Sequence, residues 1–258
     1  QTAKAVRRIA LAILPDLHRL IVCADCGGMF GRLNKMDGFF LKDVKRSFLN
    51  LGFFIGMAVV AVLLLAAVVT GAPLNRTRSS YYILTNVFAA SGFGPFAAVF
   101  PVLAYGTNFC EEYQSGYYRM IFARMSPVRF GKIRIFTVAL SGGVMLAVPI
   151  AISCAAAYIF GVPGVPQASD QGLLDGNVML TYITKYGDWY IAVGKTVLGF
   201  LFGCVWALVG FAFAVWTANR YVALIAPFVL YESLWIALDK MPYLNPIRLL
   251  RGEDVGSY

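Results

Sequence analysis

Four long stretches of this sequence contain no Asp, Glu, Lys or Arg, and each is long enough to cross a lipid bilayer as a helix. These stretches are 47–75, 79–110, 135–169 and 196–219. A transmembrane helix needs about 20 mostly apolar residues. A fifth apolar stretch, 221–238, is interrupted only by Glu232. The sequence therefore predicts an all-α polytopic membrane protein with five spans.

The boundaries of the expected elements follow from these stretches and from the charges between them. We expect spans at about 51–70, 83–109, 135–160, 193–217 and 221–239. A cytoplasmic loop, 111–134, joins the second and third spans, and an outer loop, 161–188, joins the third and fourth.

Composition supports this class of protein and excludes others. The chain is 59% hydrophobic and 14% charged, whereas soluble domains carry about 25% charged residues. Disordered chains, disulfide-framed secreted modules and most soluble enzymes are therefore excluded. The net charge of +9 does not indicate nucleic-acid binding, because no basic stretch is long and polar enough.

The positive charges instead predict an orientation in the membrane. With a cytoplasmic N-terminus, fifteen of the 22 Lys and Arg residues lie on the cytoplasmic side and six on the outer side. Cytoplasmic loops carry an excess of Lys and Arg. We therefore expect a multi-pass protein of the cell membrane with its N-terminus in the cytoplasm.

The segment before the first span has the pattern of an amphipathic helix. Apolar side chains repeat at helical spacing at Phe40, Val44, Phe48 and Leu51, and polar ones lie opposite them at Lys42, Asp43, Lys45 and Arg46. A helix with aromatic residues opposite a basic face suits the inner leaflet. The alternative is a solvated start to the first span.

Glu232 is the one acidic residue well inside a predicted span. An ionisable group in the membrane costs a few kcal/mol on insertion scales, about +2.5 to +3.5, and is a candidate functional residue. It could face a path for substrate, or it could pair with a polar neighbour such as Asn86 or Asn108.

Two pairs of glycines have the spacing that allows helices to approach closely. They are Gly52 with Gly56 and Gly199 with Gly203. Such pairs occur at contacts between transmembrane helices. They could serve packing inside one copy of the chain or at the seam of a dimer.

Residues that carry catalytic or metal chemistry are scarce. The single histidine, His18, lies on an expected surface helix, and Cys23 with Cys26 forms only half of a zinc ribbon. Two reduced cytosolic thiols are the favoured interpretation of that pair. The triplet 194–196 lacks the preceding glycine of a Walker motif and opens a span. We therefore expect no catalytic residues, no bound metal and no cofactor bound directly by this chain.

Three segments together resemble a known family. They are Lys42-Asp43-Val44-Lys45-Arg46 before the first span, Glu111-Glu112-Tyr113-x-Ser115-Gly116 with Arg119, Arg124 and Lys132 in the loop after the second, and Tyr243-Leu244-Asn245-Pro246 near the C-terminus. This pattern resembles permease subunits of the ABC-2 type of ABC transporter, mostly bacterial exporters. The resemblance covers residues 36–258 and leaves 1–35 as an N-terminal cytoplasmic or interfacial extension.

The resemblance implies a function and partners. Such permeases dimerise, as homodimers or heterodimers, and dock on a separate cytoplasmic ATPase subunit that binds ATP and Mg²⁺. The stretch 38–50 matches the family's elbow helix. The loop after the second span carries a short coupling helix, for which the candidate residues here are Glu111, Glu112, Gly116, Arg119 and Arg124.

The resemblance also implies six spans, of which this sequence shows five, the last being absent. Two rival functions stay open. One is a non-transporting membrane scaffold or sensor that binds a cytoplasmic partner through the same loop. The other is an intramembrane enzyme centred on Glu232, which lacks a second catalytic group in the sequence.

Overall fold

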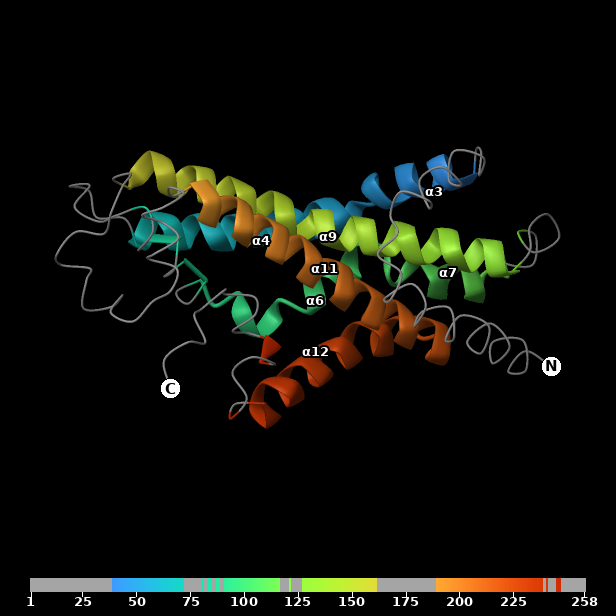
Figure 1. The fold of residues 1–258 in the computed structure, drawn as a ribbon. Coiled ribbons are helices and arrows are strands. Elements are labelled where there is room, and N and C mark those ends of the chain that lie inside the picture. The colour runs from blue at the N-terminus through green and yellow to red at the C-terminus, as the bar shows by residue number, and fades with distance from the viewer. Residues whose placement is uncertain are drawn as a thin grey trace.

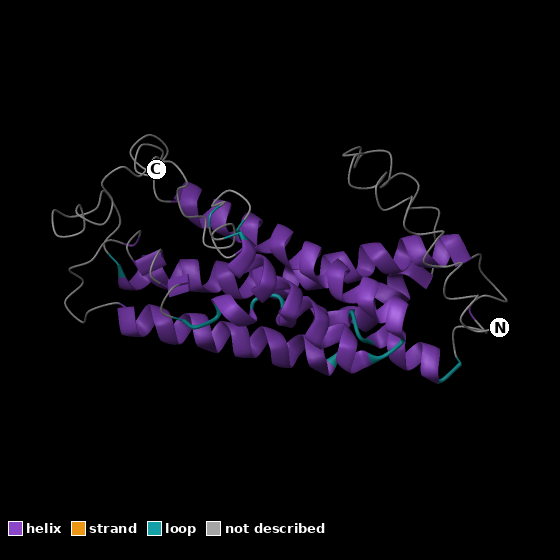
Figure 2. Ribbon diagram, turned by 90° about the horizontal axis from the view of Figure 1, so that it is seen from below, coloured by secondary structure: helices purple, strands orange, loops and turns teal. Residues whose placement is uncertain are grey.

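The computed structural model describes residues 39–71, 80, 83–84, 87–88, 91–116, 121, 127–161, 189–238, 240 and 245–246. Within these residues the chain is all-helical, with seven α-helices, one short 3-10 helix and no strand (Figure 1, Figure 2). The elements are α3 (Phe39–Phe48), α4 (Leu51–Gly71), η1 (Gly94–Phe96), α6 (Val99–Tyr105), α7 (Asn108–Gln114), α9 (Pro127–Phe160), α11 (Trp189–Thr217) and α12 (Arg220–Ala237).

Three long helices, α4, α9 and α11, lie side by side and form the body of the molecule (Figure 1). Helix α11 runs antiparallel to α9, because Gly142 lies against Gly203 while Ile150, further along α9, lies against Gly199. Helix α4 runs in the same direction as α9. The main hydrophobic core lies between these helices and includes Val60, Leu64, Leu146, Ile150, Phe202 and Trp206.

Most of the charged residues that the structure describes lie at one end of this bundle, which we call the polar end, whereas Lys195, buried near the start of α11, lies toward the other end. Helices α4 and α9 begin at the polar end, α11 finishes there, and α3 and α7 lie against it (Figure 1). Exposed cations at this end are Lys42, Lys45, Arg129, Lys132 and Arg220. Because α4 and α9 both begin at the polar end, the chain between them returns along the bundle.

Four of the described helices are long and apolar enough to cross a membrane. These candidate spans are Leu51–Thr70, Val128–Phe160, Ala192–Thr217 and Arg220–Ala237. They correspond to the first, third, fourth and fifth spans expected from the sequence. Four such helices are compatible with a multi-pass membrane protein.

The expected second span, 83–109, is not one continuous helix. Helical residues at 83–84 and 87–88 are followed by a turn at Ser91 and Gly92, then by η1, α6 and α7. Gly92 has a left-handed φ of 62°, which a helix does not accommodate. Pro95 lacks the N–H that a helix interior needs, and it stands at the start of η1. Local backbone chemistry therefore divides a stretch that carries no charged residue.

The boundaries of the loop expected at 111–134 also differ from the structure. Its first residues, Glu111 to Gln114, belong to α7, and α9 begins at Pro127 and continues through Arg134. We expected the third span to begin after Arg134 because a charge marks a membrane edge. Charges do not interrupt a helix when they are paired or exposed, so α9 extends well before its apolar part.

Helix α3 confirms an amphipathic helix before the first span, but one residue lies on the other face. Ser47 is fully buried and Asp43 is buried beside it, whereas Lys42 and Lys45 are exposed as expected. The sequence pattern placed Asp43 with the cations. It turns inward because its partners, Arg134 and Tyr105, come from distant segments of the chain.

A tight turn separates α11 from α12. Ala218 adopts a φ of 52°, and the side chain of Asn219 caps α12 by accepting a hydrogen bond from the Tyr221 N–H at 3.0 Å. Helix α12 then leaves the bundle at an angle (Figure 1), with Pro227 in its interior. It is the least buried of the four candidate spans.

Candidate functional site

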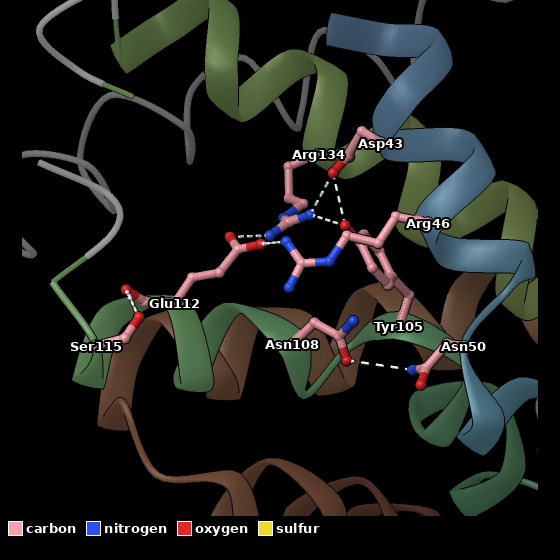
Figure 3. A network of polar contacts seen from close by, with 8 residues as sticks. All are labelled: Asp43, Arg46, Asn50, Tyr105, Asn108, Glu112, Ser115 and Arg134. Atoms are coloured by element: carbon pink, nitrogen blue, oxygen red, sulfur yellow. Dashed lines mark hydrogen bonds and ion pairs between the residues drawn. The ribbon is translucent and has the colours of Figure 1, made fainter. Parts of the chain in front are cut away.

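A cluster of charged and polar side chains joins four helices at the polar end. We call it the charge cluster, and it consists of Asp43 on α3, Arg46 on α3, Tyr105 on α6, Glu112 on α7 and Arg134 on α9 (Figure 3). Arg134 is at its centre. One guanidinium nitrogen of Arg134 lies 2.6 Å from Asp43 Oδ1, and the other donates to Glu112 Oε2.

Two further contacts close the cluster. The Tyr105 hydroxyl donates to Asp43 Oδ1 at 2.6 Å and accepts from Arg134. Arg46 Nη1 lies 2.6 Å from Glu112 Oε1, so Glu112 bridges two guanidinium groups. Two carboxylates therefore face two guanidinium groups, and the cluster is formally neutral.

Burial makes these pairings essential. The exposed side-chain fraction is 1% for Arg134, 4% for Glu112 and 6% for Asp43, against 50% for Arg46. A buried charge without a partner is strongly destabilising, because removing it from water is expensive. The Arg134 guanidinium also lies 4.5 Å from the centroid of the Tyr105 ring and 5.6 Å from that of Phe130, where a cation is attracted to the aromatic face.

The cluster is not completely satisfied. Asp43 Oδ2, Arg134 Nε and Thr137 Oγ1 are buried and have no hydrogen-bond partner within the described part of the chain. An unsatisfied buried polar group costs about 1–3 kcal/mol.

A second polar contact lies beside the charge cluster, at the joint between α3 and α4. The Asn50 side chain donates to Asn108 Oδ1 at 3.3 Å and to the Ala104 carbonyl at 3.2 Å (Figure 3). Its amide oxygen accepts from the Gly52 N–H at 3.4 Å. Asn50 therefore lies directly before α4, and its side chain ties the start of that helix to the junction of α6 and α7.

The expected coupling residues have different positions. Glu112 is inside the charge cluster, whereas its neighbour Glu111 is exposed on α7. Gly116 follows the end of α7 with a φ of 73° and donates its N–H to the Tyr113 carbonyl, a common way to end a helix. Arg119 and Arg124, like the coupling helix itself, lie outside the described residues.

Glu232 lies on α12, twelve residues after Arg220, which corresponds to about 18 Å along a helix. It is partly buried, and its Oε1 has no hydrogen-bond partner among the described residues. Asn108 bonds to Asn50, and Asn86 is outside the described residues. The structure therefore shows no pairing of Glu232 with Asn108.

The four glycines expected at helix contacts meet other helices of the same chain. A Cβ on Gly52 would lie 3.0 Å from the Leu103 carbonyl oxygen, and one on Gly203 would lie 2.4 Å from the Gly142 carbonyl oxygen. Gly56 and Gly199 meet the side chains of Met145 and Ile150 in the same way. These glycines thus serve packing within one copy.

Metal and thiol chemistry add little to the described part. His18, Cys23 and Cys26 are outside it, and its residues include no group of three His, Cys, Asp or Glu side chains suited to a metal. Cys110 on α7 is buried between helices, its Sγ 3.8 Å from the Ala214 carbonyl oxygen.

The centre of the charge cluster was not among the expected site residues. Arg134 was expected at the edge of a span, and Asp43 and Arg46 on the polar face of an amphipathic helix. One signal was present, because Arg134 stands between two isoleucines, Ile133 and Ile135, at positions that continue the helix. A charge inside an apolar helical pattern indicates a buried partner.

Comparisons with protein-family models, with curated proteins and with solved structures found no match for this chain. The function of the chain is therefore argued from its sequence and from the geometry of the charge cluster. This geometry shows a set of buried ion pairs that binds three helices together at the end of an apolar bundle.

Proposed function

We propose that this chain is the membrane-spanning permease subunit of an ATP-driven exporter, coupled to a separate cytoplasmic ATPase subunit at the polar end. The observation that carries the proposal is the ion pair between Glu112 and Arg134. These two residues lie near the two ends of the loop 111–134, which the family resemblance implies is the coupling loop. A displacement of this loop would move α7 and α9 together, because this ion pair joins them. It would also act on α3, because Arg134 is paired with Asp43.

The charge distribution supports a cytoplasmic location for the polar end. Helix α9 has 34 residues, which corresponds to about 51 Å, while the hydrocarbon core of a bilayer is about 30 Å thick. Arg134 is 26 residues before Phe160, or about 39 Å along the helix. If the apolar end of α9 lies at the outer face, the charge cluster lies at the level of the inner headgroups, beside the exposed cations.

The path of the chain supports a fifth crossing. Helix α4 leaves the polar end and α9 begins there (Figure 1), so the segment between them crosses back. We propose that this crossing is broken, with η1, α6 and α7 forming its inner part. Helix α3 is then the elbow helix, and a second copy or a related permease completes the path for substrate.

Glu232 is the proposed contact with cargo. Its depth of about 18 Å from the start of α12 is near the middle of a bilayer, and α12 diverges from the other helices (Figure 1). An ionisable side chain at that depth indicates a polar path or cavity. In the reconstituted complex, Glu232→Gln should lower export, whereas Ser233→Ala, at the exposed neighbouring position, should not. Full export by Glu232→Gln would exclude a required charge there.

The function is tested by purifying the tagged full-length chain from its native membranes and measuring ATP hydrolysis by the purified material. We expect a vanadate-sensitive ATPase to co-purify with the unaltered chain. Gly116→Trp and Arg119→Glu should weaken its retention, and Lys240→Glu, the same reversal at an exposed residue away from the loop, should not. Equal retention in all variants would contradict the loop assignment.

The same experiment separates the alternative function. A scaffold or sensor would retain a cytoplasmic partner without ATP hydrolysis, and reconstituted vesicles would show no ATP-dependent transport. Absence of ATPase activity with the unaltered chain would therefore contradict the transport function.

A further inference from the structure

The outward face of α3 has no contact with the bundle and mixes apolar and cationic side chains. Leu41 is 69% exposed and Leu49 is 62% exposed. Lys42 and Lys45 are exposed between them. Leucines this exposed on a short helix indicate a partner or a surface that covers them, because the inward face of the same helix is already buried against the charge cluster.

The two kinds of side chain are interleaved around the helix. Successive residues are about 100° apart, so going around the outward face from Arg46 the order is Lys42, Lys45 and then Leu41. Leu49, directly after the end of α3, projects between the two lysines. Each lysine of the outward face therefore has a leucine beside it.

Exposed apolar side chains continue from α3 into a surface that faces lipid in a multi-pass protein. Leu51, the first residue of α4, is 71% exposed. Exposed apolar side chains then follow along α4 at Phe54, Ile55, Val59 and Val62. The exposed lysines of α3 therefore lie at the level where this apolar surface begins, which is the level of lipid headgroups.

We propose that the outward face of α3 binds anionic phospholipid at the polar end. Lys42 and Lys45 contact headgroup phosphates, and Leu41 and Leu49 enter the boundary of the acyl chains. Lysine stems lie along apolar surface while their ammonium groups stay with the headgroups. Arg46 contributes less, since it is paired with Glu112 at 2.6 Å. The proposal rests on the membrane placement of the chain and not on its coupling to an ATPase.

The exposed cations and leucines indicate that the ligand of this face is an anionic phospholipid. Exposed cations on α3 and at the start of α9, at Arg129 and Lys132, give this end a positive field that attracts an anionic leaflet. Each Lys or Arg near such a surface contributes about 1 kcal/mol, or about a fivefold change in binding. A free anion would contact only the ammonium groups of the lysines. An anionic phospholipid would contact the exposed leucines as well.

The test uses the purified full-length chain without any partner protein. The chain is placed in nanodiscs of phosphatidylcholine alone or with phosphatidylglycerol, and hydrogen exchange of α3 and lipid retention by native mass spectrometry are measured. We expect phosphatidylglycerol to protect α3 and to be retained in preference to phosphatidylcholine. Lys42→Gln with Lys45→Gln should weaken this preference, by about fivefold for each lysine.

Controls make the result decisive. Lys240→Gln, the same change at an exposed lysine outside α3, should keep the preference. Unchanged exchange in α9 shows that a variant is folded, and Leu41→Ser provides a second variant that removes apolar contact and keeps every charge. Equal retention of the two lipids by the unaltered chain would overturn the proposal. An unchanged preference for phosphatidylglycerol in the double lysine variant would overturn it as well. Displacement of phosphatidylglycerol by inorganic phosphate would also overturn it, as would protection of α3 that requires added protein.

Discussion

Replacing Arg134 with methionine should destabilise the protein more than almost any other single substitution in the described part of the chain. The change removes both ion pairs of the guanidinium and its hydrogen bond to Tyr105. It leaves the carboxylates of Asp43 and Glu112 buried, with side-chain exposures of 6% and 4%. Breaking a buried ion pair in this way costs about 3–5 kcal/mol.

The structure places the expected loss near the lower end of that range. Asp43 keeps the hydrogen bond from the Tyr105 hydroxyl at 2.6 Å, and Glu112 keeps its ion pair with Arg46 at 2.6 Å. We therefore expect Arg134→Met to lower the free energy of unfolding by about 3 kcal/mol. Adding Asp43→Asn should recover part of this loss, because it removes the charge that was left without its main partner.

The assay is reversible unfolding in mixed detergent micelles, followed by tryptophan fluorescence. Arg129→Met, the same substitution at an exposed residue of α9, is the matched control and should change stability by no more than about 0.5 kcal/mol. The reasoning fails if Arg134→Met is no worse than Arg129→Met. It fails equally if Asp43→Asn destabilises the two backgrounds to the same extent, since the two residues would then be uncoupled.

Three further predictions concern packing, a helix end and a buried thiol. Gly203→Ala should cost about 1–3 kcal/mol, since its Cβ would lie 2.4 Å from the Gly142 carbonyl oxygen. A Cβ on Gly194, in the same helix, would meet nothing within 4 Å, so Gly194→Ala should leave the unfolding temperature unchanged or raise it. Similar losses of stability in the two variants would contradict the packing around Gly203. Gly116→Ala should lower the free energy of unfolding by about 1 kcal/mol, because φ is 73° there. Gly116→Asn should lower it less, since asparagine adopts a left-handed φ more readily than alanine. A higher unfolding temperature for the alanine variant than for the asparagine variant would refute this. Cys110 is fully buried, with its Sγ 3.8 Å from the Ala214 carbonyl oxygen, so reagents should reach its thiol slowly. Mass spectrometry should show slow alkylation by maleimide in native membranes that accelerates after denaturation, and fast labelling of the native protein would show that the thiol is exposed.

Most of the helical scaffold could be predicted from local composition. The first span was expected at about 51–70 and is observed as α4, Leu51–Gly71, because a continuous apolar stretch in lipid satisfies its backbone only as a helix. The ends of α9 at Phe160 and of α11 at Thr217 match for the same reason. These features depend on neighbours in the sequence, so a sequence is sufficient to find them.

The second span shows where this kind of prediction fails. It contains no charged residue, yet Gly92 and Pro95 set the backbone of the turn that breaks it. Both residues were visible in the sequence. Their effect depends on whether surrounding helices re-satisfy the freed backbone groups, and that depends on packing.

The candidate site was predicted only in outline. Glu112 and Gly116 were expected to matter, but Arg134 was interpreted as a boundary and Asp43 as a solvated residue. Which acid pairs with which base cannot be deduced from spacing when the partners are 91 residues apart, as Asp43 and Arg134 are. Only the approach of α3 to α9 brings these charges together.

The sequence by itself determined that the chain is helical, that it is apolar enough for a membrane and that most of its positive charges lie in two segments, 1–47 and 111–134. The tertiary structure decided which of these charges are buried and paired, which glycines lie between helices and which apolar stretch is broken. Hydropathy and helix propensity act over a few neighbouring residues, whereas an ion pair or a close helix contact forms only when distant segments meet. The charge cluster around Arg134 is therefore a property of the fold, and the apolar helices around it are a property of the sequence.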